Sequence, residues 1–230
     1  MGDQHHIQEA YLKAFEDKTG KLWVYPKNGG NPLYRPAKQC TTEHDFQSDA
    51  LELLQNQMIE TPGMRALRET HQLSDVQHKS ISLWMALHIL RNEKSFRELF
   101  QSQDWEQRFK QELETERVFS GYYRFVFICE LDGDINYWLT SDNPVIEFRI
   151  ENQFVRCCSI LPTKMILFSP RDDVPTHELG IKNLFNAIVW ANADRYVFSH
   201  KNDVSIERLQ RDATVFEIAP VLDNIQFESV

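Results

Sequence analysis

The sequence predicts an α+β fold, because helical and strand patterns occupy different parts of the chain. Apolar residues recur at helical spacing through most of residues 5–116, short segments rich in aromatic and β-branched residues follow from 122 to 168, and helical spacing returns at 178–193. Helices that precede strands, rather than alternate with them, are typical of an α+β fold with an antiparallel sheet. We expect a single domain over residues 1–230, with a helix-rich part at about 1–118 and a sheet-rich part at about 121–230. The helix-rich part includes a small hairpin and a buried central helix, and the sheet-rich part ends with a C-terminal helix.

The central helix is predicted at residues 74–100, where apolar residues occupy nearly every side. A helix that is apolar all round is buried. Ser74 and Gln77 have the spacing of a capping box, so the helix is expected to begin there. Two neighbouring faces account for the apolar pattern: Ile81, Trp84, Met85 and His88 on one, and Leu83, Leu87 and Leu90 on the next.

Further helices are predicted on either side of it. A short amphipathic helix is expected at 5–15, and helical spacing continues at 104–116. The short polar segment 41–46 is expected to lead into a helix that Ser48 caps and that Thr61-Pro62-Gly63 interrupts, since Pro and Gly both disfavour helix interiors. One side of that helix is predicted to be lined by Leu51, Leu54 and Met58.

The predicted strands are marked by turn residues between them. Residues 21–26 and 32–35 form a hairpin around Asn28-Gly29-Gly30-Asn31, because glycine supplies the positive φ of such turns. Residues 122–131 and 135–140 are expected to be adjacent antiparallel strands joined at Asp132-Gly133-Asp134. Later strands are expected at 145–150, 154–158, 160–168 and 196–198, with Pro162 placing its strand at an edge or a bulge. Residues 204–230 show only a helical turn at 206–209 and a strand at 215–218.

Composition and charge limit the classes of function. The chain has 25 basic and 34 acidic residues, a net charge of −9, and no Lys/Arg cluster of five or more. Non-specific binding to nucleic acid is therefore disfavoured, because it depends on neutralising phosphates. A local basic pocket stays open, formed by convergence of Arg65, Arg68, Arg91 and Arg97.

The sequence also bears on where in the cell the protein is expected. The first twenty residues carry no apolar stretch of a secretory signal, and no run reaches the roughly 18 apolar residues that a membrane span needs. We expect a soluble, cytoplasmic protein with no membrane partner. The four cysteines show no Cys-x-x-Cys spacing and are interpreted as reduced core residues: Cys40, Cys129, Cys157 and Cys158.

No complete catalytic motif is present. Glycine-rich phosphate and dinucleotide loops, nucleophile elbows and zinc-binding helices are absent, so there is no signal for a nicotinamide, a flavin or a structural zinc. The candidates are isolated polar residues. His88 and Arg91 lie one turn apart on the central helix, where His88 is either a functional group or a bonded core imidazole. Glu60 is expected to face solvent.

Residues 140–144, with the sequence TSDNP, allow two interpretations. A strand that ends in side-chain oxygens before a proline turn can present the Asp142 carboxylate from a rigid support. Alternatively, Asp142 and Asn143 only satisfy the backbone of the turn. Asn183 and Asn186, three residues apart on the last helix, face either a pocket or water.

Several of these segments resemble, in the same order, a bacterial and phage family known as domain of unknown function 4238. The resemblance rests on His5-His6-Ile7-Gln8 with Tyr11-Leu12-Lys13 and Phe15, on Lys21–Tyr25, on Ile59-Glu60, on Leu90-Arg91-Asn92, on Leu139–Pro144, and on Leu161-Pro162 with Asn183 or Asn186. Gln8 directly follows Ile7 where the family has Pro-Gln, and Asn92-Glu93 replaces a small residue and proline. The resemblance implies functional residues at His5, Glu60, Arg91 and Asp142, but no reaction.

These residues suggest three functions. The first is a hydrolase of a phosphoester or nucleotide-like anionic substrate, in which His5 or His88 is the acid/base, Glu60 and Asp142 supply carboxylates and Arg91 binds the anion. Asn143 and Asn183 would contact substrate, and a divalent metal could be held by the carboxylates and a histidine. The second is a non-catalytic interaction protein, such as a defence or counter-defence component, with a protein partner. The third is a sensor of a small anionic ligand.

Overall fold

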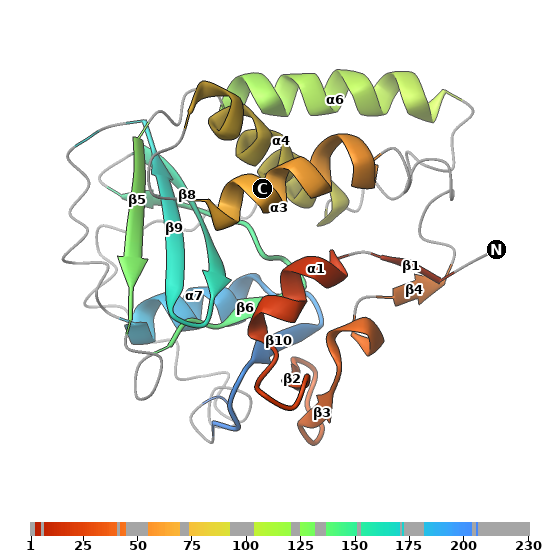
Figure 1. Cartoon of the computed structure of the whole chain (residues 1–230), viewed down its shortest axis with the longest axis vertical. Coiled ribbons are helices and arrows are strands. Elements are labelled where there is room, and N and C mark those ends of the chain that lie inside the picture. Colours follow the sequence, from red (N-terminus) through yellow and green to blue (C-terminus); the bar gives the residue numbers. More distant parts are fainter. Residues whose placement is uncertain are drawn as a thin grey trace. The chain divides into compact units, whose positions relative to one another are not determined.

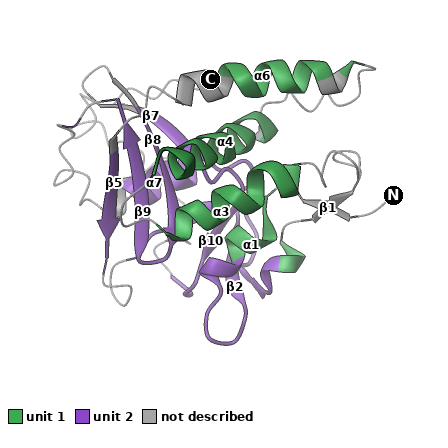
Figure 2. Cartoon of the chain, turned by 45° about the horizontal axis from the view of Figure 1, so that its top comes forward, with its two compact units in different colours: residues 1–12, 38–122 green, residues 13–37, 123–230 purple. Residues whose placement is uncertain are grey.

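The computed structural model describes residues 3–5, 7–40, 42–44, 55–69, 74–92, 104–120, 125–131, 137–150, 153–170, 172, 182–203 and 206. Helices and antiparallel sheets are both present, and the predicted α+β class is confirmed (Figure 1). The chain divides into two compact units (Figure 2): unit 1 contains residues 1–12 and 38–122, and unit 2 contains residues 13–37 and 123–230. The early hairpin thus belongs to the sheet-rich unit and not to the helix-rich part in which the sequence pattern places it.

Unit 1 opens with a short strand and not with a helix. β1 (Asp3–His5) pairs antiparallel with β4 (Thr42–His44), with His5 opposite Thr42, and α1 (Glu9–Leu12) begins only after it. The helix predicted from His5 therefore begins later, at Glu9, and the lead-in predicted around 41–46 contains a strand. The two strands satisfy each other's backbone hydrogen bonds across almost forty residues of sequence, a pairing that local periodicity does not detect.

A continuous helical segment follows, where a break was predicted. The π-helical turn η3 (Asn56–Glu60) runs directly into α3 (Thr61–Arg68), and the Thr61 N–H bonds the Asn56 carbonyl oxygen five residues back. Pro62 is the second residue of α3, directly after the π-helical turn, and because proline has no backbone N–H it donates no hydrogen bond to the preceding turn. Met58, predicted to lie on the same side of this helix as Leu51 and Leu54, is 65% exposed, whereas Ile59 and Glu60 are buried; Leu51 and Leu54 lie outside the described residues.

The central helix α4 (Asp75–Asn92) packs against α3 and against α6 (Trp105–Ser120). The predicted capping box is confirmed: the Gln77 N–H donates to Ser74 Oγ at 3.3 Å, and the Ser74 N–H donates to Gln77 Oε1 at 2.9 Å. Gly63 allows α3 and α4 to approach closely, because a Cβ at this position would lie 2.8 Å from Cγ of Trp84. Apolar side chains of α4 are buried, as predicted: Ile81, Trp84, Met85, Leu87 and Leu90.

The described residues of unit 2 form two four-stranded antiparallel sheets. In the first, the order is β3-β2-β10-β6, formed by β3 (Leu33–Arg35), β2 (Leu22–Pro26), β10 (Tyr196–Ser199) and β6 (Thr140–Ser141). The predicted hairpin is confirmed, with Trp23 opposite Tyr34. Gly29 and Gly30 in its turn have φ values of 88° and 123°, which only glycine adopts readily.

The second sheet has the order β5-β9-β8-β7, formed by β5 (Phe125–Glu130), β9 (Lys164–Ser169), β8 (Gln153–Leu161) and β7 (Ile146–Ile150). The predicted pairing of 122–131 with 135–140 was wrong, because β5 pairs with β9 and β6 pairs with β10. Nearly every residue of β9 is buried, so this strand takes a central position with a neighbour on each side. Pro162 lies in the turn between β8 and β9, next to a register shift at Ser159 and Leu161.

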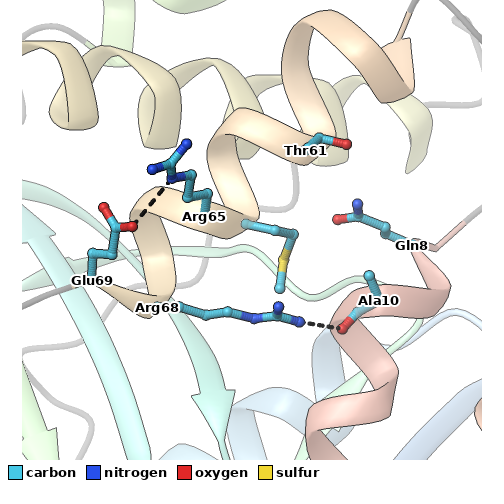
Figure 3. A pocket seen from close by; sticks show the side chains of 7 residues that line it. Gln8, Ala10, Thr61, Arg65, Arg68 and Glu69 are labelled. Atoms are coloured by element: carbon cyan, nitrogen blue, oxygen red, sulfur yellow. Dashed lines mark hydrogen bonds and ion pairs between the residues drawn. The ribbon is translucent and has the colours of Figure 1, made fainter.

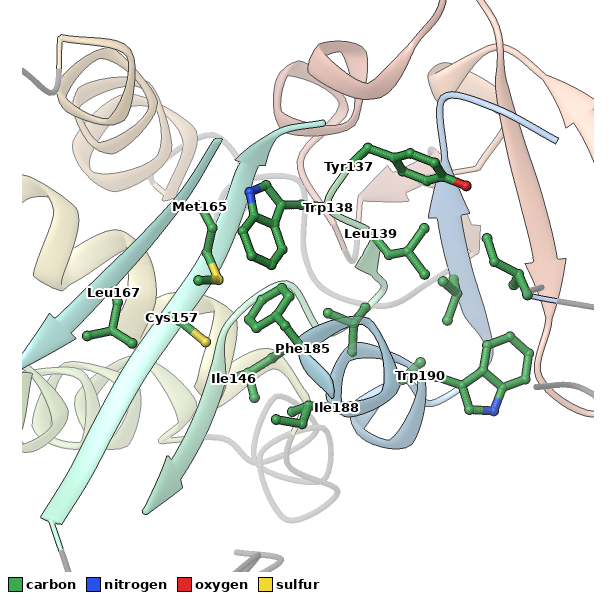
Figure 4. Packing of buried hydrophobic residues seen from close by; sticks show 14 of the residues in the cluster. Tyr137, Trp138, Leu139, Ile146, Cys157, Met165, Leu167, Phe185, Ile188 and Trp190 are labelled. Atoms are coloured by element: carbon green, nitrogen blue, oxygen red, sulfur yellow. The ribbon is translucent and has the colours of Figure 1, made fainter. Parts of the chain in front are cut away.

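The helix α7 (Lys182–Asn192) packs on β6 and β7 and supplies much of the core of unit 2 (Figure 4). Its apolar residues join inward-facing residues from both sheets. The rings of Trp138 and Phe185 meet edge to face with centroids 5.0 Å apart, an arrangement that aromatic pairs favour. Other members of this core are Tyr25, Leu139, Ile146, Val155, Met165, Leu167, Ile188 and Val197.

Two further expectations concern cysteines and membranes. All four cysteines are free, and Cys40, Cys157 and Cys158 are buried while Cys129 is half-buried. Burial raises the pKa of the Cys158 thiol to about 12, which keeps this thiol protonated and unreactive at neutral pH. Among the helices of the described residues, none has both the length and the apolar content to cross a membrane.

Candidate functional site

Glu60 and Arg91 form a buried ion pair in unit 1. Arg91 Nη1 donates to Glu60 Oε1 at 2.5 Å, and Arg91 Nη2 donates to Gln55 Oε1 at 2.6 Å. The three residues are almost completely buried, so the prediction that Glu60 faces solvent was wrong. Both terminal nitrogens of Arg91 are therefore engaged by the protein itself.

The π-helical turn explains why Gln55 and Glu60 reach the same guanidinium group. Hydrogen bonds of a π-helix join residues five apart and each turn holds more residues than in an α-helix, so side chains five apart come nearer to the same face. In an α-helix the equivalent spacing is four, and residues five apart point in different directions. The sequence pattern fails here because it assumes the α-helical period, and this also accounts for the exposure of Met58.

His88 lies one turn before Arg91 and is surrounded by aromatic side chains. Its ring centroid is 4.2 Å from that of Trp84 and 6.4 Å from that of Tyr11, and the side chain is 1% exposed. A histidine buried to this degree does not meet a soluble substrate without movement of its neighbours. The geometry is that of a core imidazole.

Asp142, in unit 2, holds the turn between α7 and β10. Its Oδ1 accepts from the Asp194 N–H at 3.0 Å, and its Oδ2 accepts from the N–H groups of Arg195 and Tyr196 at 2.8 and 3.2 Å. Burial raises the pKa of the Asp142 carboxyl, and these backbone donors oppose that rise. These donors belong to the turn at 194–196, so the Asp142 carboxylate bonds backbone N–H groups, as in the second interpretation, but those of another turn than TSDNP itself.

The asparagines of unit 2 also bond the backbone. Asn143 Nδ2 donates to the Asn192 carbonyl oxygen at 2.7 Å, beside the turn that Asp142 holds. Asn186 accepts from the Leu139 N–H at 2.9 Å and donates to the Tyr137 carbonyl oxygen at 3.0 Å. Asn183 lies on α7, but its side chain is outside the described part of the chain.

Two further residues named in the sequence predictions have side chains outside the described part of the chain. His5 is placed by its backbone in β1, while its side chain is outside the described residues, as is Arg97. Among the described residues, no group of three or more His, Cys, Asp or Glu side chains gathers in a way that could hold a metal ion.

Unit 1 contains a pocket of about 270 Å³ between α1 and α3 (Figure 3). It is smaller than the roughly 300–1,000 Å³ typical of sites for drug-sized ligands. Arg65 and Arg68, two of the four arginines for which a local basic pocket was left open, both line it. The full lining is Gln8, Ala10, Thr61, Met64, Arg65, Arg68 and Glu69.

The two arginines differ in their partners. Arg65 Nε donates to Glu69 Oε1 at 3.2 Å, and Figure 3 shows its guanidinium turned toward Glu69. Arg68 extends across the pocket, and its Nη2 lies 3.4 Å from the Ala10 carbonyl oxygen, which is long for a hydrogen bond. Within the described part of the chain, no carboxylate pairs with Arg68. Most of the N–H donors of Arg68 therefore have no acceptor among the described residues.

Gln8 forms another wall of the pocket and is tied to the central helix. Trp84 Nε1 donates to Gln8 Oε1 at 3.2 Å, and both side chains are buried. Sequence reasoning placed Gln8 only in an opening motif. The motif marked the residue, but its pairing with Trp84 joins positions 76 apart in sequence.

Comparisons with known proteins add no relatives: no family model, no curated protein and no solved structure matches the chain.

Proposed function

We propose that the protein binds a small anionic ligand in the pocket of unit 1, as a sensor or carrier and without chemical turnover. The observation that carries this proposal is Arg68, a guanidinium that crosses a pocket with most of its five N–H donors unused by the described residues. Arginine is well suited to planar, bidentate recognition of anionic oxygens.

The charge around the pocket supports an anion. Two guanidinium groups and one carboxylate line it, a net charge of +1 on a chain whose overall charge is −9. A pocket of about 270 Å³ accommodates a small molecule and not a polymer. The overall acidity disfavours nucleic acid as the ligand, since long polyanions meet the repulsive field of the whole protein.

Binding is favoured over hydrolysis by the state of the expected catalytic groups. Glu60 is paired with Arg91, and Asp142 accepts three backbone hydrogen bonds, so neither carboxylate is available as a general base in this arrangement. A non-catalytic interaction protein would need no such pocket, so this hypothesis does not explain it. Membership in the domain of unknown function 4238 family stays a proposal, and it assigns no activity in either case.

A thermal-shift screen with small anions tests the proposal. Inorganic phosphate, sulfate, short carboxylates and nucleoside monophosphates are added to the wild type, to Arg68→Gln and to Arg108→Gln. A ligand at about 100 times its Kd adds about 2.7 kcal/mol to the free energy of unfolding, or roughly 5–10 °C in Tm for a chain of this size. We expect at least one anion to raise the Tm of the wild type and of Arg108→Gln, but not of Arg68→Gln.

Arg108 is a matched control because it is an exposed arginine on α6 that does not line the pocket. The proposal is wrong if no anion stabilises the wild type, or if Arg68→Gln responds like Arg108→Gln. Turnover of p-nitrophenyl phosphate by the wild type and its loss in Arg68→Gln would favour the hydrolase instead.

A further inference from the structure

Gln8 presents a hydrogen-bond donor to the pocket, and Trp84 determines this orientation. The indole N–H can only donate, so the carboxamide must turn its oxygen toward Trp84. The Nε2 group is then the polar end that remains. Gln8 is 8% exposed and lines the pocket, and no partner for Nε2 is found among the described residues. Figure 3 shows the carboxamide directed from α1 toward α3.

Gln8 Nε2 is not fully buried, so water can reach this donor until a ligand acceptor takes its place. Arg68 offers N–H donors to the same pocket. The Thr61 hydroxyl donates to Asn56 Oδ1 at 3.0 Å, and Glu69 accepts from Arg65 and from Gln77 Nε2. Arg68 and Gln8 Nε2 are the donors in the pocket for which the described side chains supply no acceptor, and acceptor oxygens of a ligand would match them.

We infer that the ligand is a small monocarboxylate whose two oxygens are held by Arg68 and by Gln8 Nε2, and that Gln8 is the residue that selects it. This inference rests on the proposed function, because it names the ligand class of the same pocket. The charges decide between a carboxylate and a phosphate ester. With Arg65 neutralised by Glu69, Arg68 supplies the one uncompensated positive charge, which a monoanion balances.

A phosphate monoester carries close to two negative charges at neutral pH and would leave the pocket with an excess negative charge on an already acidic protein. The apolar part of the ligand has its own surface in the pocket. Met64, which is buried, and Ala10 line it, and the flexible thioether of methionine adapts to varied aliphatic groups. A carboxylate with a short aliphatic chain matches both the cationic and the apolar lining of the pocket.

Isothermal titration calorimetry with three matched probes tests the inference at pH 7.5: butyrate, propyl phosphate and the neutral butyramide. The variants are Gln8→Glu and Gln8→Met. Gln8→Glu keeps an acceptor for Trp84 but replaces the donor by a negative oxygen, and Gln8→Met removes the donor without adding charge. The control is Gln107→Glu, which makes the same change at an exposed site on α6.

We expect butyrate to bind the wild type and Gln107→Glu more tightly than either other probe. Butyrate affinity should fall about tenfold or more in Gln8→Glu, since a hydrogen bond to a charged group is replaced by repulsion, and by a smaller factor in Gln8→Met. Tighter binding of propyl phosphate, or equal butyrate affinity in the wild type and both Gln8 variants, would overturn the inference and leave the proposed function standing. Failure of the wild type to bind butyrate would also overturn the inference, whereas the proposed function fails only if no anion of the thermal-shift screen stabilises the wild type.

Discussion

At the scale of single residues, the polar groups that the sequence singles out are mainly engaged in holding the protein together. Glu60 and Arg91 neutralise each other inside unit 1, and Asp142 secures a turn inside unit 2. Removing one partner of a buried pair is costly because the other charge is left without compensation. Arg68 and Gln8 are the groups available to a ligand. Among the described residues, Arg68 has no carboxylate partner and the Gln8 Nε2 group has no acceptor.

The buried pair leads to a stability prediction. Glu60→Ala should lower the free energy of unfolding by about 3–5 kcal/mol, because it strands the Arg91 guanidinium in the core. Glu69→Ala is the matched control, since it breaks an exposed Arg–Glu pair, which contributes only about 0–1 kcal/mol. Urea unfolding measures both values. Equal losses in the two variants would mean that the buried pair has no special role.

A second residue-scale prediction concerns pH. The hydrogen bond from Tyr34, followed by those from Thr19, lowers the pKa of Asp17 from 3.8 to about 2. Because the folded-state pKa is depressed, the contribution to stability is present above pH 3.8 and is lost as the pH falls toward 2.

Tyr34→Phe should therefore return the pKa of Asp17 toward 3.8, as measured by NMR titration of its carboxyl carbon. Tyr196→Phe, the same substitution on β10 of the same unit, should leave it depressed. An Asp17 pKa that stays near 2 in Tyr34→Phe would remove the tyrosine as its cause.

At the scale of elements, the packing of α3 on α4 positions the pocket wall. Gly63 faces Trp84 at the contact between the helices, and Trp84 in turn orients Gln8. Arg65 and Arg68 follow on the same helix, two and five residues later. The separation of these helices therefore affects the orientation of the groups that line the pocket.

Gly63→Ala tests this contact through the sign of its effect. In an exposed helix interior, alanine is more favourable than glycine by about 1 kcal/mol. Here the added methyl group would overlap the Trp84 side chain, so we expect destabilisation of about 1–3 kcal/mol instead. Thermal unfolding gives the result. A higher Tm in Gly63→Ala would show that the two helices are not held in close contact.

At the scale of the whole molecule, the chain passes between the two units more than once. Residues 13–37 lie in unit 2 between two stretches of unit 1, and they supply β2, which lies between β3 and β10 in the first sheet. A cut near residue 122, where the sequence composition changes, removes β2 and β3 from the remainder of their sheet.

The fragment 123–230 should therefore lack a native fold, as judged by poor dispersion of its ¹H–¹⁵N NMR spectrum. Joining residues 13–37 to it through a long flexible linker should restore dispersion, because β2 and β3 return to the sheet and Lys27 again donates to the Ala191 carbonyl oxygen. Native-like dispersion in the fragment alone would contradict the sheet order described above.

Local signals in the sequence predicted much of this fold. The capping box of Ser74 and Gln77 and the glycine turn of the hairpin depend on neighbouring residues, and both are confirmed. The pairing of β5 with β9 and of β1 with β4 depends on distant residues, which periodicity does not register. The π-helical turn was not predicted either, because its residues do not follow the 3.6-residue period of an α-helix.

The candidate site was predictable only in part, for the same reason. The sequence left a basic pocket open, and Arg65 and Arg68 do line a pocket, whereas Arg91 is turned inward to a glutamate that the sequence placed at the surface. Whether an arginine is open or paired depends on its contacts and not on its type. The donor role of Gln8 follows from Trp84, which lies in another element.

The measurement that tests the central claim most directly is a ¹H–¹⁵N NMR titration with butyrate, following the side-chain amide of Gln8 and the Nε–H of Arg68. Spectra of Gln8→Glu and Arg68→Gln assign these two signals. We predict that both shift along one saturable curve, while exposed side chains of α6 such as Gln107 stay unchanged. Saturable binding seen elsewhere in the spectrum, with the Gln8 and Arg68 signals unmoved, would contradict the proposal that this pocket is the ligand site.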